Sequence, residues 1–238
     1  MFSGQGSQYF QMARELYDKH ARFRSAVRRL DAVAQSVMGR SPIEEAYRGE
    51  KSQNFDRLRD THPAIFIIEH ALAECLISDG IVPDMTLGAS LGTFAAASIA
   101  GFIDAEQALH TIMAQADAVE AACELGGMTA IIDTPSLYDE SFLRDSTTLA
   151  GINFDRHFVV SAAPMALDAA EGELRARGIV HQRLAVRYAF HSPWIESARD
   201  DVMALLSALP VTDGRIPMAC CTTADVSHRA FGPDHVPE

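Results

Sequence analysis

The stretch Gly88-Ala89-Ser90-Leu91-Gly92 constrains the fold of this chain more than any other part of its sequence. It follows a short apolar strand-like run and precedes SLGTFAAASIAGFI, whose small apolar residues are typical of a buried helix. A serine at such a strand-to-helix turn is exposed at the head of the helix, where backbone N–H groups and the helix dipole stabilise a developing oxyanion. The motif therefore predicts that Ser90 is a nucleophile in an α/β fold, although small-residue turns are common and a structural role stays open.

The rest of the chain divides into helical and strand-like regions. Apolar residues at helical spacing predict helices within residues 8–38, 61–76 and 104–123. Short runs rich in Val, Ile and Thr predict three strands, one helix and a further strand between residues 126 and 187, and residues 190–209 return to helix. We therefore expect one α/β domain, residues 1–125 and 188–238, that is interrupted by a small α/β subdomain, residues 126–187.

The composition excludes several classes of protein. Of the 238 residues, 48% are hydrophobic and 22% are charged, which is ordinary for a soluble globular protein. No apolar run reaches the roughly 18 residues of a membrane span. The net charge of −12 argues against nucleic acid as a partner, because phosphate binding needs a basic surface. The four cysteines form no C-x-x-C pair and the N-terminus has no signal-peptide pattern, so we expect a cytoplasmic protein with reduced thiols and no metal site.

Two further stretches could complete a catalytic site. A serine nucleophile needs a base, and among nine histidines His191 is favoured because it follows an apparent strand and precedes Pro193, in a loop that would face a cleft. Gln5 lies between two glycines, which lets its backbone approach another group closely. A phosphate-binding loop is the competing interpretation of this glycine pair, but no Gly-Lys-Ser/Thr follows it.

Four motifs occur in order along the chain: FSGQGSQ, DTHPAIFIIEHAL, GASLG and YAFHSP. Their order and separations resemble those of malonyl-CoA:acyl-carrier-protein transacylases and of the acyltransferase domains of polyketide synthases, and the resemblance covers nearly the whole chain. It implies the acyltransferase fold. In that fold, an α/β-hydrolase-like core with a parallel sheet, residues 1–125 and 188–238, holds an inserted ferredoxin-like subdomain, residues 126–187.

The resemblance also implies roles for individual residues. Ser90 corresponds to the acylated nucleophile and His191 to its general base and acid, while the backbone N–H groups of Gln5 and Leu91 correspond to the oxyanion hole. The implied reaction is ping-pong acyl transfer from a phosphopantetheine thioester, carried by acyl carrier protein or coenzyme A, with no bound cofactor. The carrier protein would be acidic, so the arginines of the small subdomain are candidate contacts: Arg175, Arg177, Arg183 and Arg187.

Three residues near the nucleophile depart from the family pattern. Gln115 occupies the position of an arginine that binds the carboxylate of malonyl groups in the family, and no Arg or Lys occurs from Leu87 to Ser141. Ala89 replaces the histidine of G-H-S-x-G, and His62 replaces the glutamine of T-Q-P-A. Losing one partner of a buried charge pair costs about 2–5 kcal/mol, and each 1.4 kcal/mol is about tenfold, so a carboxylated acyl group should bind at least tens of times less well.

These departures favour an acyl group without a free carboxylate, for which Phe190 and Asn153 are further candidate contacts. One subset of the resembled family, the stand-alone acyl hydrolases of polyketide synthases whose acyltransferases act in trans, lacks the arginine and removes acyl groups from blocked carrier proteins. The sequence thus predicts an acyl hydrolase that edits stalled modules. Three alternatives stay open: a malonyl-CoA or other acyl-CoA transacylase, a non-catalytic module that docks carrier proteins, and a relaxed or inactive enzyme in which Gln115 has drifted.

The ends of the chain raise one more expectation. Little of a first strand precedes FSGQG, and the sequence stops at GPDHVPE, before the terminal segment in which the resembled family supplies a strand and the carbonyl that faces the catalytic histidine. We therefore expect the chain to be a fragment of a longer protein.

Overall fold

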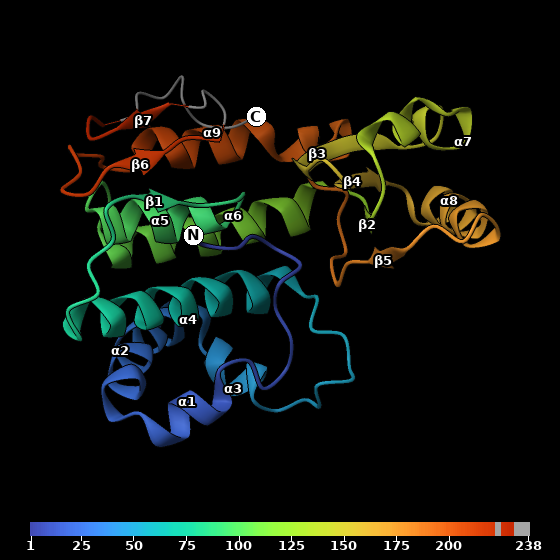
Figure 1. Ribbon diagram of the computed structural model, residues 1–238. Coiled ribbons are helices and arrows are strands. Elements are labelled where there is room, and N and C mark those ends of the chain that lie inside the picture. The colour runs from blue at the N-terminus through green and yellow to red at the C-terminus, as the bar shows by residue number, and fades with distance from the viewer. Residues whose placement is uncertain (222–224, 231–238) are drawn as a thin grey trace. The chain divides into compact units, whose positions relative to one another are not determined.

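The computed structural model describes residues 1–221 and 225–230, which divide into two compact units (Figure 1). The first unit is Met1–Asp117 with Asp201–Glu238, and the second is Ala118–Asp200. The second unit is longer than the insert that we expected over residues 126–187. One of the additional residues, Phe190, is bonded to a strand of this unit, because the Ser161 hydroxyl donates to Phe190 O (2.5 Å).

Four helices form the first part of the first unit. They are α1 (Arg14–Lys19), α2 (Ala21–Met38), α3 (Pro42–Ala46) and α4 (Leu58–Ser78). The helix predicted within residues 8–38 is two helices, because His20 has an extended backbone and its Nδ1 caps α2 by accepting a hydrogen bond from the Phe23 N–H (3.1 Å). Periodicity did not predict the short α3, which depends on Pro42 in its first turn and on the Ser41 side chain, which accepts from the Glu44 N–H.

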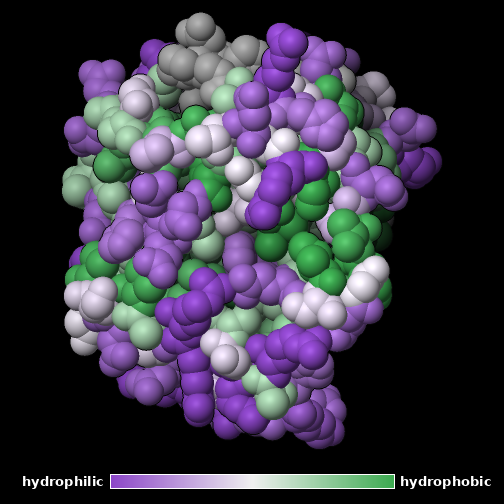
Figure 2. All heavy atoms as spheres, turned by 90° about the vertical axis from the view of Figure 1, so that its left-hand side faces the viewer, coloured by the Kyte–Doolittle hydropathy of each residue, from purple (hydrophilic) through white to green (hydrophobic). Residues whose placement is uncertain are grey.

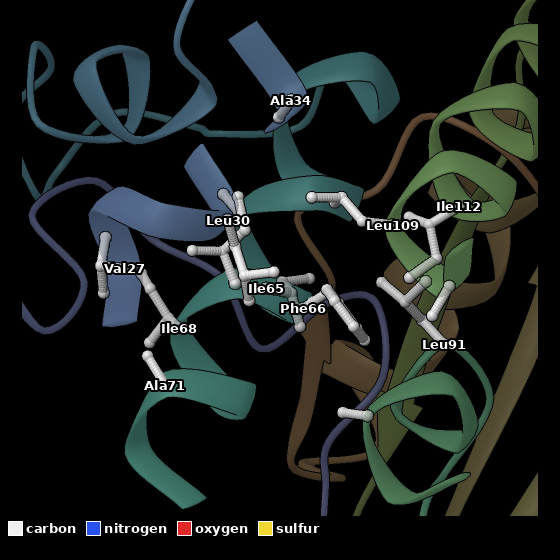
Figure 3. Close-up of a cluster of buried hydrophobic side chains, with 14 of the residues drawn as sticks. Val27, Leu30, Ala34, Ile65, Phe66, Ile68, Ala71, Leu91, Leu109 and Ile112 are labelled. Atoms are coloured by element: carbon white, nitrogen blue, oxygen red, sulfur yellow. The ribbon is translucent and has the colours of Figure 1, made fainter. Parts of the chain in front are cut away.

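The hydrophobic core of the first unit extends from α2 and α4 to α5 (Gly92–Ala100) and α6 (Ala105–Ala122). The helix predicted over residues 61–76 is confirmed, and it begins earlier, at Leu58. Figure 3 shows Leu30 of α2 close to Ile65 of α4, and Leu91, at the head of α5, close to Ile112 of α6. The core therefore fixes the position of the residue that follows Ser90.

A small mixed sheet carries the strand before Ser90. β1 (Thr86–Leu87) pairs in parallel with β6 (Met218–Ala219), which follows α9 (Arg199–Ala208), and β6 pairs antiparallel with β7 (Val226–Ser227). On the other side of β1, Phe2 forms a parallel bridge with Gly88. Both neighbours of β1 are therefore parallel to it, which agrees with the predicted parallel core, and β7 adds an antiparallel strand.

The second unit contains a four-stranded antiparallel sheet in the order β3-β4-β2-β5. Its elements are β2 (Gly127–Ile131), η1 (Pro135–Asp139), α7 (Ser141–Arg144), β3 (Thr148–Phe154), β4 (His157–Ala162), α8 (Pro164–Ala176), β5 (His181–Arg183) and η2 (Pro193–Ala198). The predicted succession of elements was incomplete, because it lacked η1 and α7, which lie between β2 and β3. The resulting β-α-β-β-α-β succession is ferredoxin-like, and the apolar side of α8 shares a core with the sheet.

The surface of the first unit is partly apolar. Figure 2 faces the side on which α4 ends, and it shows exposed hydrophobic groups between hydrophilic ones. The exposed apolar residues at that end of α4 and in the loop before β1 are Leu72, Leu76, Ile81, Val82 and Met85. Within residues 1–221 and 225–230, no helix is long and apolar enough to cross a bilayer, no cysteine is in a disulfide, and no group of three His, Cys, Asp or Glu could hold a metal ion.

Candidate active site

Ser90 lies on a sharp turn between β1 and α5. Its backbone is left-handed, with a φ of 51°, and Leu91 then begins α5. A residue with a side chain in this region stores roughly 1–3 kcal/mol of strain. In the part of the chain that the structure describes, four residues other than glycine have positive φ, and Ser90 and His191 are two of them. Such strain is concentrated at functional sites, and the two predicted catalytic residues share it with Gln11 and Ala13.

Close backbone contacts explain both glycines of the motif. A Cβ at Gly88 would lie 2.3 Å from the carbonyl carbon of Gly92, and a Cβ at Gly92 would lie 2.5 Å from the carbonyl oxygens of Phe2 and Ser3. Carbon atoms that are not bonded prefer about 3.5–4.0 Å. The turn therefore needs glycine at positions 88 and 92.

The N-terminal segment lies directly against this turn. The Phe2 N–H donates to Leu87 O (2.8 Å), and the Ala89 N–H donates to Phe2 O (3.0 Å). Gly4 follows, and a Cβ there would lie 2.7 Å from Ala89 O and 3.1 Å from the Ser90 Cβ. The Gly-Gln-Gly turn is thus brought beside the predicted nucleophile, although the two are far apart in the sequence.

Two backbone N–H groups next to Ser90 are available to a substrate. Among the described residues, neither the Gln5 N–H nor the Leu91 N–H donates a hydrogen bond to the protein. The side chain of Leu91 is buried in the core, and the side-chain Nε2 of Gln5 donates to Thr61 Oγ1 (2.9 Å). Both groups are therefore held in place with their N–H bonds unused, which is what a preformed oxyanion hole requires.

His62 is buried in α4, next in sequence to Thr61. Burial lowers the pKa of His62 to about 4, because the charged imidazolium loses its hydration there. The imidazole is therefore neutral at pH 7. It cannot replace the arginine with which the resembled family binds a carboxylate.

Gln115 lies on α6, and its Oε1 is buried without a hydrogen-bond partner among the described residues. Two residues further along α6, Asp117 is bound by Arg59 of α4 (Nε to Oδ1, 2.5 Å). The guanidinium of Arg59 is therefore already in an ion pair with α6. Ala89 is exposed beside Ser90 and presents only a methyl group. These positions offer a neutral acceptor and an apolar surface, and no free charge.

His191 lies in the second unit, in the loop between β5 and η2, with a φ of 56°. Its neighbours are held by hydrogen bonds: the Ser161 hydroxyl donates to Phe190 O, and the Ser192 hydroxyl donates to Ala189 O. The residue as a whole is exposed. Protein atoms around the imidazole nevertheless remove part of its hydration, and this desolvation lowers the pKa of His191. The imidazole is therefore neutral at pH 7, the form that can accept a proton.

Phe190 and Asn153, the two remaining candidate contacts, lie at opposite ends of β4. Phe190 is bonded to Ser161 near the C-terminal end of the strand, whereas Asn153 contacts His157 at its N-terminal end (Nδ2 to Nδ1, 3.3 Å). At roughly 3.3 Å per residue, these two ends are about 13 Å apart. Of these two residues of the second unit, Phe190 is the one that lies next to His191.

Sequence reasoning missed two residues that hold the candidate site. Thr61 binds the Gln5 side chain, and Ser161 binds the backbone that precedes His191. Thr61 adjoins His62 within one of the four motifs, so its place in the motif was a usable signal. Ser161 is a polar residue within an apolar strand, and nothing local marks its hydroxyl as a support for a loop.

The sequence matches a protein-family model described as acyl transferase domain over residues 1–231. It is 40% identical over 228 residues to the polyketide biosynthesis acyltransferase homolog BaeD of Bacillus velezensis, a match that covers 94% of this chain and 70% of BaeD. It is 39% identical to the polyketide biosynthesis acyltransferase homolog PksD of Bacillus subtilis, covering 96% of this chain and 71% of PksD.

Solved structures give the same result for the fold. The acyltransferase domain from the second module of the salinomycin polyketide synthase is 30% identical to this chain and superimposes with a TM-score of 0.82. The match covers 98% of this chain and 55% of that one, so this chain spans just over half of the solved chain. The predicted α/β acyltransferase fold is confirmed.

Proposed function

Because the chain belongs to the acyl transferase domain family, we propose that it is an acyl hydrolase that removes acyl groups from the phosphopantetheine thioesters of acyl carrier proteins and so frees stalled polyketide synthase modules. One observation carries the proposal: Ser90 lies on a strained turn beside two N–H groups that could hold an oxyanion, while α6 carries Gln115 and no Arg or Lys for a malonyl carboxylate. The polyketide setting is supported by the descriptions of the two Bacillus relatives.

In the first half-reaction, Ser90 becomes acylated. Its Oγ attacks the thioester carbonyl carbon while the imidazole of His191 accepts the hydroxyl proton. The carbonyl oxygen gains negative charge, which the N–H groups of Gln5 and Leu91 stabilise together with the N-terminus of α5. The C–S bond then breaks, and the departing thiolate takes the proton from His191. The products are acyl-Ser90 and a free phosphopantetheine thiol.

In the second half-reaction, water attacks the acyl-Ser90 ester. His191 accepts a proton from this water, and the same two N–H groups hold the new oxyanion. The bond to Ser90 Oγ then breaks, Oγ recovers the proton from His191, and the acyl group leaves as a carboxylic acid. A transacylase would instead pass the acyl group to a second thiol, so the two functions differ in which nucleophile reaches the ester.

The proposed substrate is an acyl group without a free carboxylate, and the neutral residues predicted to line the site support this proposal. The buried Oε1 of Gln115 can accept a hydrogen bond from a hydroxyl of the acyl group, and the neutral His62 adds no charge. Ala89 and Phe190 would contact alkyl carbons. Asn153 would meet only an acyl chain long enough to extend to the N-terminal end of β4.

The proposed partner is an acyl carrier protein, and phosphopantetheine enters as part of the substrate with no bound cofactor. The ion pairs of the second unit favour two of the four predicted arginine contacts. Arg177 and Arg183 are each bonded to two acidic residues of the second unit. Arg175 and Arg187 are exposed and form no ion pair among the described residues. Arg187 precedes His191 on the same segment, so we propose it as the main contact.

Intact-protein mass spectrometry of the carrier protein tests this function. One reaction contains butyryl-carrier protein and the enzyme, and the other contains unloaded holo-carrier protein, malonyl-CoA and the enzyme. Each reaction is repeated with Ser90→Ala. We expect the butyryl mass to disappear only with intact Ser90, and we expect no malonyl gain in the second reaction.

Two other outcomes would change the assignment. A malonyl gain that depends on Ser90 would identify a transacylase and would show that the argument from Gln115 is wrong. If no acyl-enzyme forms and neither carrier protein changes mass, the chain is a docking module without catalytic activity.

A further inference from the structure

Glu69 is a half-buried carboxyl group of α4 that the proposed mechanism does not use. Its Oε1 accepts hydrogen bonds from the backbone N–H of Ser3 (2.7 Å) and from the Ser3 hydroxyl (2.6 Å). We propose that Glu69 is a positioning residue: it holds the segment from Ser3 to Gln5 so that the Gln5 N–H stays in the oxyanion hole. The inference rests on the proposed acylation of Ser90.

The segment is attached to α4 at both ends. Ser3 bonds to Glu69, and the Gln5 side chain bonds to Thr61, which precedes Glu69 by about two helical turns. At 1.5 Å per residue the two positions are about 12 Å apart along the helix, and they differ by roughly 80° around it, so both lie on one side of α4. Because α4 is largely buried in the core of the first unit, the segment takes its position from that core.

A shift of Ser3 would be transmitted to the oxyanion hole. Gly4 already lies so close to Ala89 O that a Cβ on it would be 2.7 Å away, so the segment has room to move only away from Ser90. The Gln5 N–H follows Gly4 by one peptide bond and would move with it. Hydrogen bonds weaken steeply as their angle and length depart from the optimum. The weaker hydrogen bond would destabilise the transition state, in which the oxygen is charged, more than the bound substrate.

The Ser3 hydroxyl lies between Glu69 and Ser7 in a small hydrogen-bond network. The Ser7 hydroxyl donates to Gly4 O (2.9 Å), and Ser3 Oγ lies 2.9 Å from Ser7 Oγ. A hydroxyl carries one proton, so Ser3 can donate to Ser7 or to Glu69 but not to both. Glu69 Oε2 is buried without a hydrogen-bond partner among the described residues, so the attachment of Ser3 depends on Oε1 alone. Burial raises the pKa of the Glu69 carboxyl, although the hydrogen bonds from Ser3 act in the opposite direction.

Three variants separate this role from a general effect on folding. Glu69→Ala removes the attachment, Glu69→Gln keeps a neutral group with a donor and an acceptor, and Glu74→Gln is the control. Glu74 lies on the same helix, is half-buried like Glu69, and bonds to Arg29. The first measurement is single-turnover acylation of Ser90 by butyryl-pantetheine. The second compares the affinity for its trifluoromethyl ketone analogue, whose hemiketal with Ser90 carries an oxyanion, with the affinity for its unreactive amide analogue.

We expect Glu69→Ala to lower the saturating acylation rate and the ketone affinity by about tenfold or more, which is less than the 10²–10³-fold loss on removing an oxyanion donor. The half-saturating substrate concentration and the amide affinity should change less than about twofold, because the ground state makes little use of the oxyanion hole. Glu69→Gln should restore most of the rate, and Glu74→Gln should match the wild type. If Glu69→Ala does not fold, Ser3→Ala is used instead. It should lower the acylation rate and the ketone affinity by a smaller factor, and it should leave the half-saturating substrate concentration and the amide affinity almost unchanged.

Other results would overturn the inference. Equal losses of ketone and amide affinity would mean that Glu69 supports the structure in general, and an unchanged acylation rate would mean that it does not position Gln5. A wild-type protein that is never acylated at Ser90 would remove the proposed function together with this inference. Wild-type acylation with no effect of Glu69→Ala would remove this inference alone.

Discussion

Backbone conformation and side-chain environment, rather than residue type alone, distinguish the residues that we predict to be reactive. The sequence has nine histidines, and among the described residues His191 is the one with a positive φ. His62 belongs to one of the four motifs, but burial removes its ability to carry a charge at pH 7. The two histidines therefore differ in their proposed roles: His191 is the proposed proton acceptor, whereas His62 is a buried neutral ring.

Gln115→Arg should introduce malonyl loading. The guanidinium would give a malonyl carboxylate the partner that Gln115 cannot supply, and such pairs are worth about 2–5 kcal/mol, so the preference for malonyl over butyryl should rise by at least about tenfold. Competition between malonyl-CoA and butyryl-CoA for Ser90, read from the mass of the acyl-enzyme, measures it. Gln115→Met is the neutral control. If both variants keep the wild-type preference, residue 115 does not face the acyl group.

His62→Gln should make the stability of the protein less dependent on pH. The pKa of His62 is about 4 in the folded chain and about 6.5 when unfolded, so the unfolded state gains its proton first as the pH falls. The stability linked to this residue is fully present above pH 6.5 and is lost between pH 6.5 and 4, up to about 3 kcal/mol. Urea unfolding at pH 7.5 and pH 5 measures the difference. The exposed His110→Gln is the control, and the same loss for wild type and His62→Gln would contradict a buried neutral ring.

Among the secondary-structure elements, those with long periodic patterns were predicted and the short ones were not. The patterns of α4 and α6 extend over many turns, and both helices occur as predicted. In contrast, α3, η1 and α7 span five residues or fewer and depend on local caps, while β6 and β7 have two residues each and exist through their partners. A pattern needs several repeats to be read, and these elements are too short to contain them.

Gly92→Ala and Gly172→Ala should have opposite effects. A Cβ at Gly92 meets the backbone of Phe2 and Ser3 at 2.5 Å, so the turn and the N-terminal segment must separate, at a cost of about 1–3 kcal/mol. Gly172 lies exposed on α8 with nothing within 4 Å, and alanine should stabilise that helix by about 0.5–1 kcal/mol. Melting temperatures of both variants measure this, with loss of Ser90 acylation expected for Gly92→Ala alone. A stable, active Gly92→Ala would mean that the segment does not lie against the turn.

At the scale of the whole molecule, charge opposes the proposed partner. The chain carries a net charge of −12, and an acidic carrier protein would be repelled at long range. Recognition must therefore depend on local positive groups that are not already neutralised. Arg177 and Arg183 are ion-paired within the second unit, which leaves Arg175 and Arg187 of the four arginines predicted to contact the carrier protein.

Arg187→Gln should weaken the use of acyl-carrier protein without affecting a small substrate. Removing this exposed charge should raise the KM for butyryl-carrier protein severalfold, mainly through slower association. The rate on butyryl-pantetheine should stay the same, because that substrate lacks the acidic protein. Arg177→Gln removes the same charge from a residue whose guanidinium is already bonded, and it should have little effect. If the two variants behave alike, Arg187 is not the contact.

The sequence by itself determined which residues are candidates for the proposed reaction. Glycines at fixed spacing around Ser90 and Gln5 are required by turns that no other residue can form, so the motifs are visible without a structure. The same holds for the long helices, whose period of apolar residues reports which side is buried.

Only the tertiary structure decided what those groups touch. It brings Ser3 and Gly4 against the turn at Ser90, leaves the N–H groups of Gln5 and Leu91 unused, and attaches the segment to Glu69. These facts depend on contacts between residues far apart in the chain. Burial, which lowers the pKa of His62 and raises that of Glu69, depends on the same contacts, so no local pattern of residues could have predicted it.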